Sequence, residues 1–302
     1  PHIACQRELR MPVACLTARV AHEENQHMGL RMSAARGWVL LCLLNLAGAT
    51  HAAEALEYRV EYRGVFSAGS ELPIADLRLD EQLSAEGPGL TRTRIEASSI
   101  AYPLIESLFP IRYRLRSWNR ADNAGLVAFE TYESMRKKRH RLYLRDDSLS
   151  GVRRYDLLQG DGQEELGRLE AGLGPLQTQT AKGPVDRLGL LQRVRGKALA
   201  ENANYRFEVT SGRELLVYEV SVVAAQTLNI AGTELAAWKL RFDGMQRGRE
   251  GEPEAAHRPV YVWLSRAAGH VPLRVESRHP IGRFRVELKQ GPALDQVARA
   301  DF

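Results

Sequence analysis

Residues 56–63 read Leu-Glu-Tyr-Arg-Val-Glu-Tyr-Arg, and this strict alternation of apolar and charged residues decides the fold class. Successive side chains of an extended strand point to opposite faces, so Leu56, Tyr58, Val60 and Tyr62 would share one face. The charged residues between them would share the other face. The segment is therefore predicted to be a β-strand that is buried on one side only.

The same period of two recurs along most of the remaining chain. Two runs, 215–223 and 260–264, are apolar at successive positions and are predicted to be central strands covered on both faces. Strands spaced by about 8 to 12 residues favour an antiparallel sandwich or barrel over βαβ units. The other candidate strands are 75–83, 90–97, 111–116, 126–132, 139–145, 205–209, 235–242, 271–277 and 283–288.

Helix is expected at one main place. Residues 187–199 follow Asp186, whose carboxylate is suited to cap the first amides of a helix. An apolar stripe runs along this segment, with basic residues facing away from it. The stripe consists of Leu188, Leu191, Val194 and Ala198. A short helical turn is also expected over 104–109, whereas 158–183 and 244–257 are expected to be long loops.

Residues 28–52 have the pattern of a secretory signal peptide. Arg31 and Arg36 form the basic region, 38–47 the apolar region, and small residues before Ala53 the cleavage site. The apolar run is too short for a spanning helix, which needs about 20 residues. The sequence thus predicts a non-native upstream extension over 1–27, a signal peptide over 28–52, one β domain over 53–290 and a polar tail over 291–302. The predicted location is the periplasm.

The mature chain would contain no cysteine, because Cys5, Cys15 and Cys42 all precede Ala53. Disulfides, cysteine nucleophiles and cysteine-bound zinc are therefore excluded from it. The formal net charge of the whole chain is only +5, which is too small to indicate a nucleic-acid partner.

Several short motifs, in this order and spacing, resemble the bacterial envelope domain-of-unknown-function family numbered 3108. They are Pro184-Val185-Asp186-Arg187-Leu188-Gly189-Leu190-Leu191-Gln192, Ile230-Ala231-Gly232-Thr233, Trp238-Lys239-Leu240, Val262-Trp263-Leu264-Ser265, Val271-Pro272-Leu273-Arg274-Val275 and Ile281-Gly282. The chain departs from the family pattern at Gly189, where a serine is expected. The family looks like an all-β relative of the periplasmic lipoprotein carriers of the LolA and LolB type. The resemblance implies no catalytic residues.

The resemblance and the strand pattern together predict an all-β fold with one or two helices. A curved antiparallel sheet would form an incomplete barrel or sandwich packed around an amphipathic helix. A lipid or other amphiphile could then bind between the sheet and the helix. The hypothetical cavity is lined by Tyr58, Tyr62, Tyr113, Leu188, Leu191, Val194, Phe207 and Trp263. The alternative interpretation of the same residues is an ordinary packed core.

Basic residues concentrate between 112 and 145. They are candidates for contact with the anionic headgroups of a membrane or with an envelope protein. Equally, they could be the solvated edge of a sheet that resists aggregation. The candidate contact residues are Arg112, Arg114, Arg116, Arg136, Lys137, Lys138, Arg139 and Arg141.

Catalytic and metal-binding patterns are poor. The mature histidines have no metal-ligand spacing, and neither a Gly-x-Ser-x-Gly elbow nor a phosphate-binding glycine loop is present. We therefore expect no cofactor, no metal and no enzymatic activity. Three functions remain: a carrier of an amphiphile, an envelope assembly scaffold that uses a basic surface or a sheet edge, and, less favoured, a hydrolase with two dispersed carboxylates.

Overall fold

The computed structural model describes residues 55–83, 90–120, 125–134, 137–146, 151–171, 183–247 and 252–300. The predicted upstream extension and signal peptide lie outside these residues. The strands are β1 (Leu56–Gly64), β2 (Leu72–Leu83), β3 (Leu90–Ser98), β4 (Arg112–Arg120), β5 (Leu126–Ser134), β6 (Lys138–Asp146), β7 (Gly151–Asp156), β8 (Asn204–Thr210), β9 (Leu215–Ile230), β10 (Thr233–Arg247), β11 (Pro253–Ala255), β12 (Val260–Ser265), β13 (Pro272–His279) and β14 (Gly282–Leu288). The helices are α1 (Pro103–Leu108), α2 (Gln163–Glu170), α3 (Arg187–Arg195) and α4 (Pro292–Ala300), with short 3-10 turns η2 (Val65–Ser67) and η4 (Leu157–Gln159).

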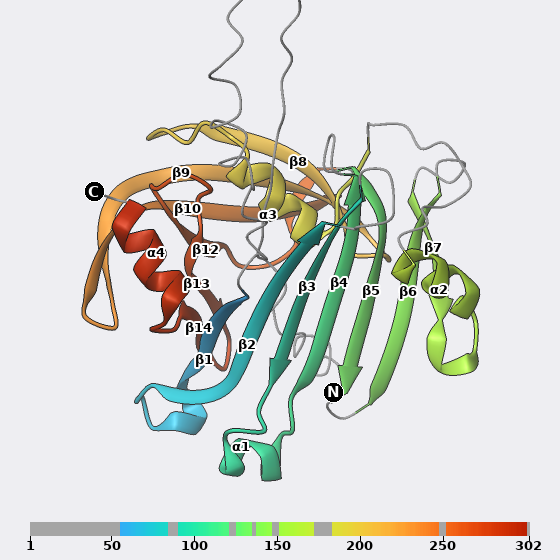
Figure 1. Cartoon of the computed structure of the whole chain (residues 1–302), viewed down its shortest axis with the longest axis horizontal. Coiled ribbons are helices and arrows are strands. Elements are labelled where there is room, and N and C mark those ends of the chain that lie inside the picture. The colour runs from blue at the N-terminus through green and yellow to red at the C-terminus, as the bar shows by residue number, and fades with distance from the viewer. Residues whose placement is uncertain are drawn as a thin grey trace, which may run out of the picture.

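All the named strands join one 14-stranded sheet in the order β7-β6-β5-β4-β3-β2-β1-β14-β13-β12-β10-β9-β8, with β11 added beside β10. Every strand pair is antiparallel, and β1 pairs with β14, so the two ends of the domain meet in the middle of the sheet. The sheet curves strongly and nearly closes into a barrel around α3 (Figure 1). The predicted fold class is therefore confirmed.

The two ends of the strand order approach each other across the opening. Gly212, in the turn after β8, lies so close to β6 that a Cβ at this position would overlap the ring of Tyr143. That ring stacks on Phe129 of β5, with centroids 4.5 Å apart. On the free side of β8, Val185 forms a parallel bridge to Val209. The β8 edge is thus partly covered by Val185, two residues before α3.

The predicted strands are all present, but the expectation for 215–223 is wrong in one respect. Burial alternates along β9 instead of covering both faces, because β9 lies next to the last strand of the sheet. β12, in contrast, is buried on both faces as expected. The sequence analysis missed β7, which pairs with β6.

The helices differ more from expectation. α1 and α3 lie where helix is predicted, although α3 ends at Arg195 rather than at residue 199. The predicted loop over 158–183 contains α2, and the predicted polar tail contains α4. Leu294 and Val297 of α4 are buried in the main core, and α4 packs against β10. Both helices were missed because single leucine and valine positions in polar segments reveal a buried face only once the sheet is in place.

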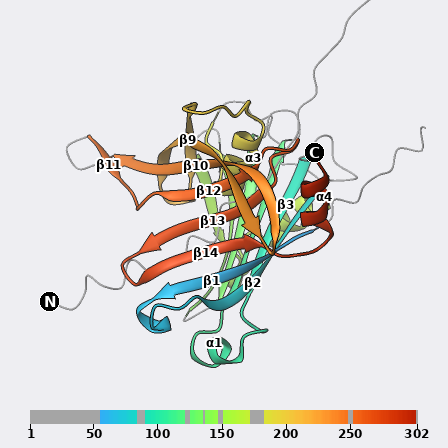
Figure 2. The same ribbon diagram turned by 90° about the vertical axis from the view of Figure 1, so that its left-hand side faces the viewer.

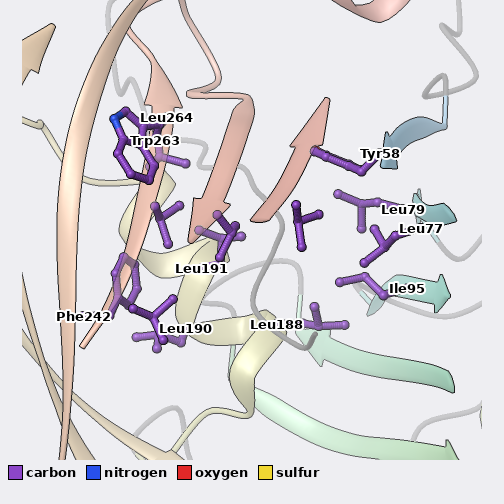
Figure 3. Close-up of a cluster of buried hydrophobic side chains, with 14 of the residues drawn as sticks. Tyr58, Leu77, Leu79, Ile95, Leu188, Leu190, Leu191, Phe242, Trp263 and Leu264 are labelled. Carbon is purple, nitrogen blue, oxygen red and sulfur yellow. The ribbon is translucent and has the colours of Figure 1, made fainter. Parts of the chain in front are cut away.

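Two apolar clusters lie on opposite faces of the sheet. The main cluster surrounds α3 and draws residues from most strands, as the close-up in Figure 3 shows around Leu188, Leu190 and Leu191. The smaller cluster includes Leu142, adjacent in sequence to Tyr143 of the main cluster, and therefore lies on the other face of β6. Leu166 of α2 covers it.

Candidate functional site

The residues predicted to line a cavity are brought together, and they form part of a filled core. Tyr58, Leu188, Leu191 and Val194 have 0% exposure, as does Leu190 beside them. A void that could hold a water molecule would leave exposed area on the side chains lining it. No such void therefore adjoins these side chains.

The other predicted lining residues are also in contact with this core. Tyr62 and Phe207 are buried in it, and Tyr113 packs against it. Trp263 is buried too, but its ring faces two cations, with Lys239 Nζ 5.2 Å and Arg274 Cζ 5.8 Å from the ring centroid. Burial raises the pKa of the Tyr58 and Tyr113 hydroxyls far above the usual value for tyrosine. The Tyr58 hydroxyl donates to the carbonyl oxygen of Pro272 at 3.0 Å.

A buried polar network fixes α3 against the β3–β4 part of the sheet. Asp186 caps the helix by accepting from the Gly189 amide at 2.9 Å, and the same carboxylate accepts from Ser117 Oγ at 2.9 Å. At the next turn, Gln192 Nε2 donates to Thr93 Oγ1 at 2.7 Å. Burial raises the pKa of Asp186 despite these hydrogen bonds. The helix is therefore held by directional contacts in addition to apolar packing.

Gly189, the departure from the family pattern, stands at a tight place in this network. A Cβ there would lie 3.1 Å from Asp186 Oδ1 and 3.2 Å from Asn119 Oδ1. Asn119 Oδ1 is buried and has no hydrogen-bond partner in the described part of the chain. A glycine thus lets the helix start come close to β4.

Four of the eight predicted basic contact residues are paired with carboxylates. Glu130 on β5 has 0% exposure and pairs with both Arg114 and Arg116, and His140 Nε2 lies 2.5 Å from its Oε1. Burial alone would raise the pKa of Glu130, but the hydrogen bond and charge of Arg116, helped by His140 and Arg114, lower it overall. These residues form a structural ion cluster on the face that α2 covers, where Arg116 also pairs with Glu170.

The remaining basic candidates are divided. Arg112 pairs with Glu106 at 2.6 Å, and Arg139 with Glu133 at 3.5 Å. Arg141 is half-buried, while Lys137 and Lys138 at the β5–β6 turn are exposed. Arg136 lies outside the described residues.

The feature that sequence reasoning missed is a set of exposed large apolar side chains on two neighbouring connections, β1–β2 and β3–β4. We call this set the apolar end. Its members are Val65, exposed by 75%, Phe66 by 73%, Ile100 by 67%, Leu104 by 63%, Leu108 by 60% and Phe109 by 55%. Figures 1 and 2 both show η2 and α1 at the same end of the sheet. Large apolar residues in tight turns were the available signal, because such turns are usually polar.

The β1–β2 connection holds its apolar side chains out by internal hydrogen bonds. Ser67 Oγ donates to the carbonyl oxygen of Ser70 at 2.7 Å, and Ser70 Oγ donates back to that of Ser67 at 2.6 Å. The amide of Val65 donates to the carbonyl oxygen of Ile281 in the next hairpin at 3.2 Å. The turn is therefore fixed with Val65 and Phe66 in solvent.

The β3–β4 connection is fixed by an ion pair. Arg112 donates to both carboxylate oxygens of Glu106, at 2.6 and 2.9 Å, and Ser99 Oγ donates to the same carboxylate at 2.6 Å. The hydrogen bonds from Arg112 and Ser99 lower the pKa of Glu106 to about 2. Ile105 packs inward against the core, so Leu104 and Leu108, which are four residues apart, share the outward face of α1.

Neither a metal centre nor a spanning helix emerges from the described part of the chain. It contains no group of three or more histidine, cysteine, aspartate or glutamate side chains placed to hold a metal ion. Of its helices, none is both long and apolar enough to cross a membrane.

Comparison with known proteins identifies a family and finds solved structures to which the chain is similar. A family model described as "Protein of unknown function (DUF3108)" matches residues 57–289. No curated protein matches the chain. The fold is similar to a β-barrel-like protein of the domain of unknown function DUF1849 from Brucella abortus, with 12% identity, a TM-score of 0.42, and coverage of 78% of this chain and 95% of that chain. It is also similar to the hypothetical lipoprotein YmcC from Escherichia coli, with 10% identity, a TM-score of 0.31, and coverage of 77% and 86%.

Proposed function

The chain belongs to the DUF3108 family of proteins of unknown function, and from that premise we propose that it is a non-catalytic, exported envelope protein that binds an amphiphile at its apolar end. The observation that carries the proposal is the exposure of six large apolar side chains on two adjacent connections. Scattered exposed apolar residues are normal on a soluble protein, but a gathered set marks an interaction surface.

Fixed geometry supports this interpretation. A hydrophobic turn that was only loosely held would fold its side chains back onto the core. Here the ion pair between Glu106 and Arg112 and the hydrogen bonds of Ser67 hold the two connections outward. A surface organised in this way loses little conformational entropy on binding.

The filled core favours an external site over an interior one. A carrier that encloses its cargo needs a lined void, whereas Leu188, Leu191 and Val194 are completely covered. The proposed amphiphile site is therefore on the outside of the barrel. An envelope scaffold remains the second candidate, and it would use the same surface to bind an apolar protein segment.

Export rests on the signal pattern over 28–52. The protein recovered from a periplasm should begin at Ala53 or within a residue or two of it, which intact mass would establish. A product that still carries Met32 would contradict the predicted cleavage.

A fluorescent label on α1 tests the amphiphile site. The mature chain would have no cysteine, so Ser107→Cys, on exposed α1, can carry a single environment-sensitive dye. Non-ionic detergent micelles should shift its emission to the blue, because the dye would enter an apolar phase. The same dye at Thr227→Cys, exposed on β9, is the matched control and should not shift. An unchanged spectrum at Ser107→Cys, or equal shifts at both positions, would overturn the proposal.

A further inference from the structure

Exposed cations lie on both sides of the apolar end. On one side is the β5–β6 turn with Lys137 and Lys138. The strand register shows that this turn lies near the β3–β4 connection. Arg112, the first residue of β4, pairs with Ser134, and Ser134 pairs with Lys138. Neighbouring strands are about 4.8 Å apart, so Lys138 lies about 10 Å from the start of β4.

The other side of the apolar end carries two exposed arginines. Arg63 lies one residue before the end of β1, and it pairs in register with Arg283, which in turn pairs with Arg278. Arg63 and Arg278 are exposed, and neither forms an ion pair with another described residue. Arg283, between them, is paired with Glu71 and Glu276, so Arg63 and Arg278 are the two cations of this row that form no ion pair with a described residue.

The carboxylates Glu71, Glu106 and Glu133 at this end do not cancel the charges of Arg63, Arg278, Lys137 and Lys138, because each is paired with another arginine. Glu71 pairs with Arg283 at 2.6 Å and with Arg285 at 3.0 Å. Glu106 and Glu133 are occupied by Arg112 and Arg139, as described above. The apolar end is therefore bordered by net positive charge.

Resting on the function proposed above, we infer that the amphiphile is the surface of an anionic lipid bilayer. Phe66 and Leu104, with their apolar neighbours, would enter the boundary between headgroups and acyl chains, as interfacial apolar residues do. The bordering cations, Lys137, Lys138 and Arg63 among them, would contact the phosphates of the headgroups. Basic residues near such a surface each strengthen binding, and the effect extends over about one Debye length.

Vesicle sedimentation of the exported protein tests this inference. Vesicles of phosphatidylcholine alone are compared with an equimolar mixture of phosphatidylcholine and phosphatidylglycerol. The protein should bind the mixture far more tightly, and added salt should weaken that binding. Lys137→Gln with Lys138→Gln should reduce affinity for the mixture about fivefold for each lysine, and should leave affinity for phosphatidylcholine unchanged.

The apolar contribution needs its own variant. Leu104→Ser with Leu108→Ser should weaken binding to both kinds of vesicle by about tenfold or more. Replacing both by methionine should restore it, which separates loss of apolar contact from damage to α1. Val223→Ser, at an exposed position of β9, is the matched control and should bind like the unaltered protein.

The outcomes separate the inference from the proposed function. Equal binding to both vesicles, insensitive to salt and to the lysine changes, would refute the anionic surface and leave the amphiphile site standing. No binding to either vesicle, with no dye shift in micelles, would refute both and favour a protein partner.

Discussion

At the residue scale, Asp186 joins the start of α3 to the sheet. Its carboxylate caps α3 through the Leu188 and Gly189 amides and also accepts from Ser117 on β4. One side chain therefore sets both where the helix begins and which strand it faces. The group is almost completely buried, and its ionised form has no cationic partner among its hydrogen bonds.

Replacement of Asp186 gives a prediction with a definite sign. Because burial raises its pKa above 3.8, Asp186 favours the folded state at low pH and loses that contribution as pH rises through the raised value. Asp186→Asn, which retains the cap acceptor, should be as stable as the unaltered protein or more stable at neutral pH. Its advantage should shrink as pH falls toward 3.8.

Asp186→Ala is the contrasting variant. It removes the cap and leaves Ser117 without its acceptor, and it should cost about 2 kcal/mol of unfolding free energy. Urea denaturation at several pH values measures both variants. A loss for Asp186→Asn as large as that for Asp186→Ala would show that the ionised carboxylate is favourable in the core.

At the element scale, α3 is enclosed by the curved sheet, and its side chains are buried in the main core. Leu190, which was not part of the predicted apolar stripe, is fully buried, and Gln192 donates to Thr93 on β3. The helix is enclosed because the sheet curves around it and because Val185, two residues before it, pairs with the edge of β8. The apolar stripe therefore predicted only part of the helix surface that is buried.

The packing of α3 in the core can be tested by shortening one of its buried side chains. Leu191→Ala should leave a void in a packed core and cost about 2 to 5 kcal/mol of unfolding free energy. The unaltered protein, extracted with organic solvent after gentle purification, should release no lipid from its interior. The matched change at exposed Leu104, Leu104→Ala, should cost less than about 0.5 kcal/mol. A small loss of unfolding free energy for Leu191→Ala, together with extractable lipid, would support the alternative that the protein carries an amphiphile between the sheet and α3.

At the scale of the whole molecule, a close approach between Gly212 and Tyr143 contributes to closure of the sheet. Gly212 has φ of 82° and lies against the ring of Tyr143, joining the β8–β9 turn to β6. The two segments are far apart in the strand order, so this contact helps to convert a curved sheet into a nearly closed barrel.

Two glycine variants isolate that contact. Gly212→Ala should suffer both the strain of positive φ and the overlap with Tyr143. Gly232→Ala, in the β9–β10 turn with φ of 88° and open space around it, should suffer the strain alone, about 1 to 2 kcal/mol. Urea denaturation gives the loss of unfolding free energy for each variant. The difference between the two losses measures how much the contact between Gly212 and Tyr143 contributes to stability. Equal losses would mean that the contact between Gly212 and Tyr143 does not stabilise the closed barrel.

The sequence by itself determined the features that depend on neighbours along the chain. The alternation in 56–63 marks β1 and its buried face, because a strand has a period of two whatever it pairs with. Asp186 marks the start of α3, because capping needs only the next two or three amides. The order of short motifs was likewise enough to indicate the family.

Only the tertiary structure decided the features that join distant residues. Glu130 neutralises Arg114 and Arg116, two residues of the predicted basic surface. The antiparallel pairing of β4 and β5 places the Glu130 side chain beside both arginines. The apolar end exists because β2 lies between β1 and β3, so that two short connections about 35 residues apart emerge at the same end of the sheet. Burial and charge pairing are properties of packed neighbours in space, and those neighbours are set by the order of the strands.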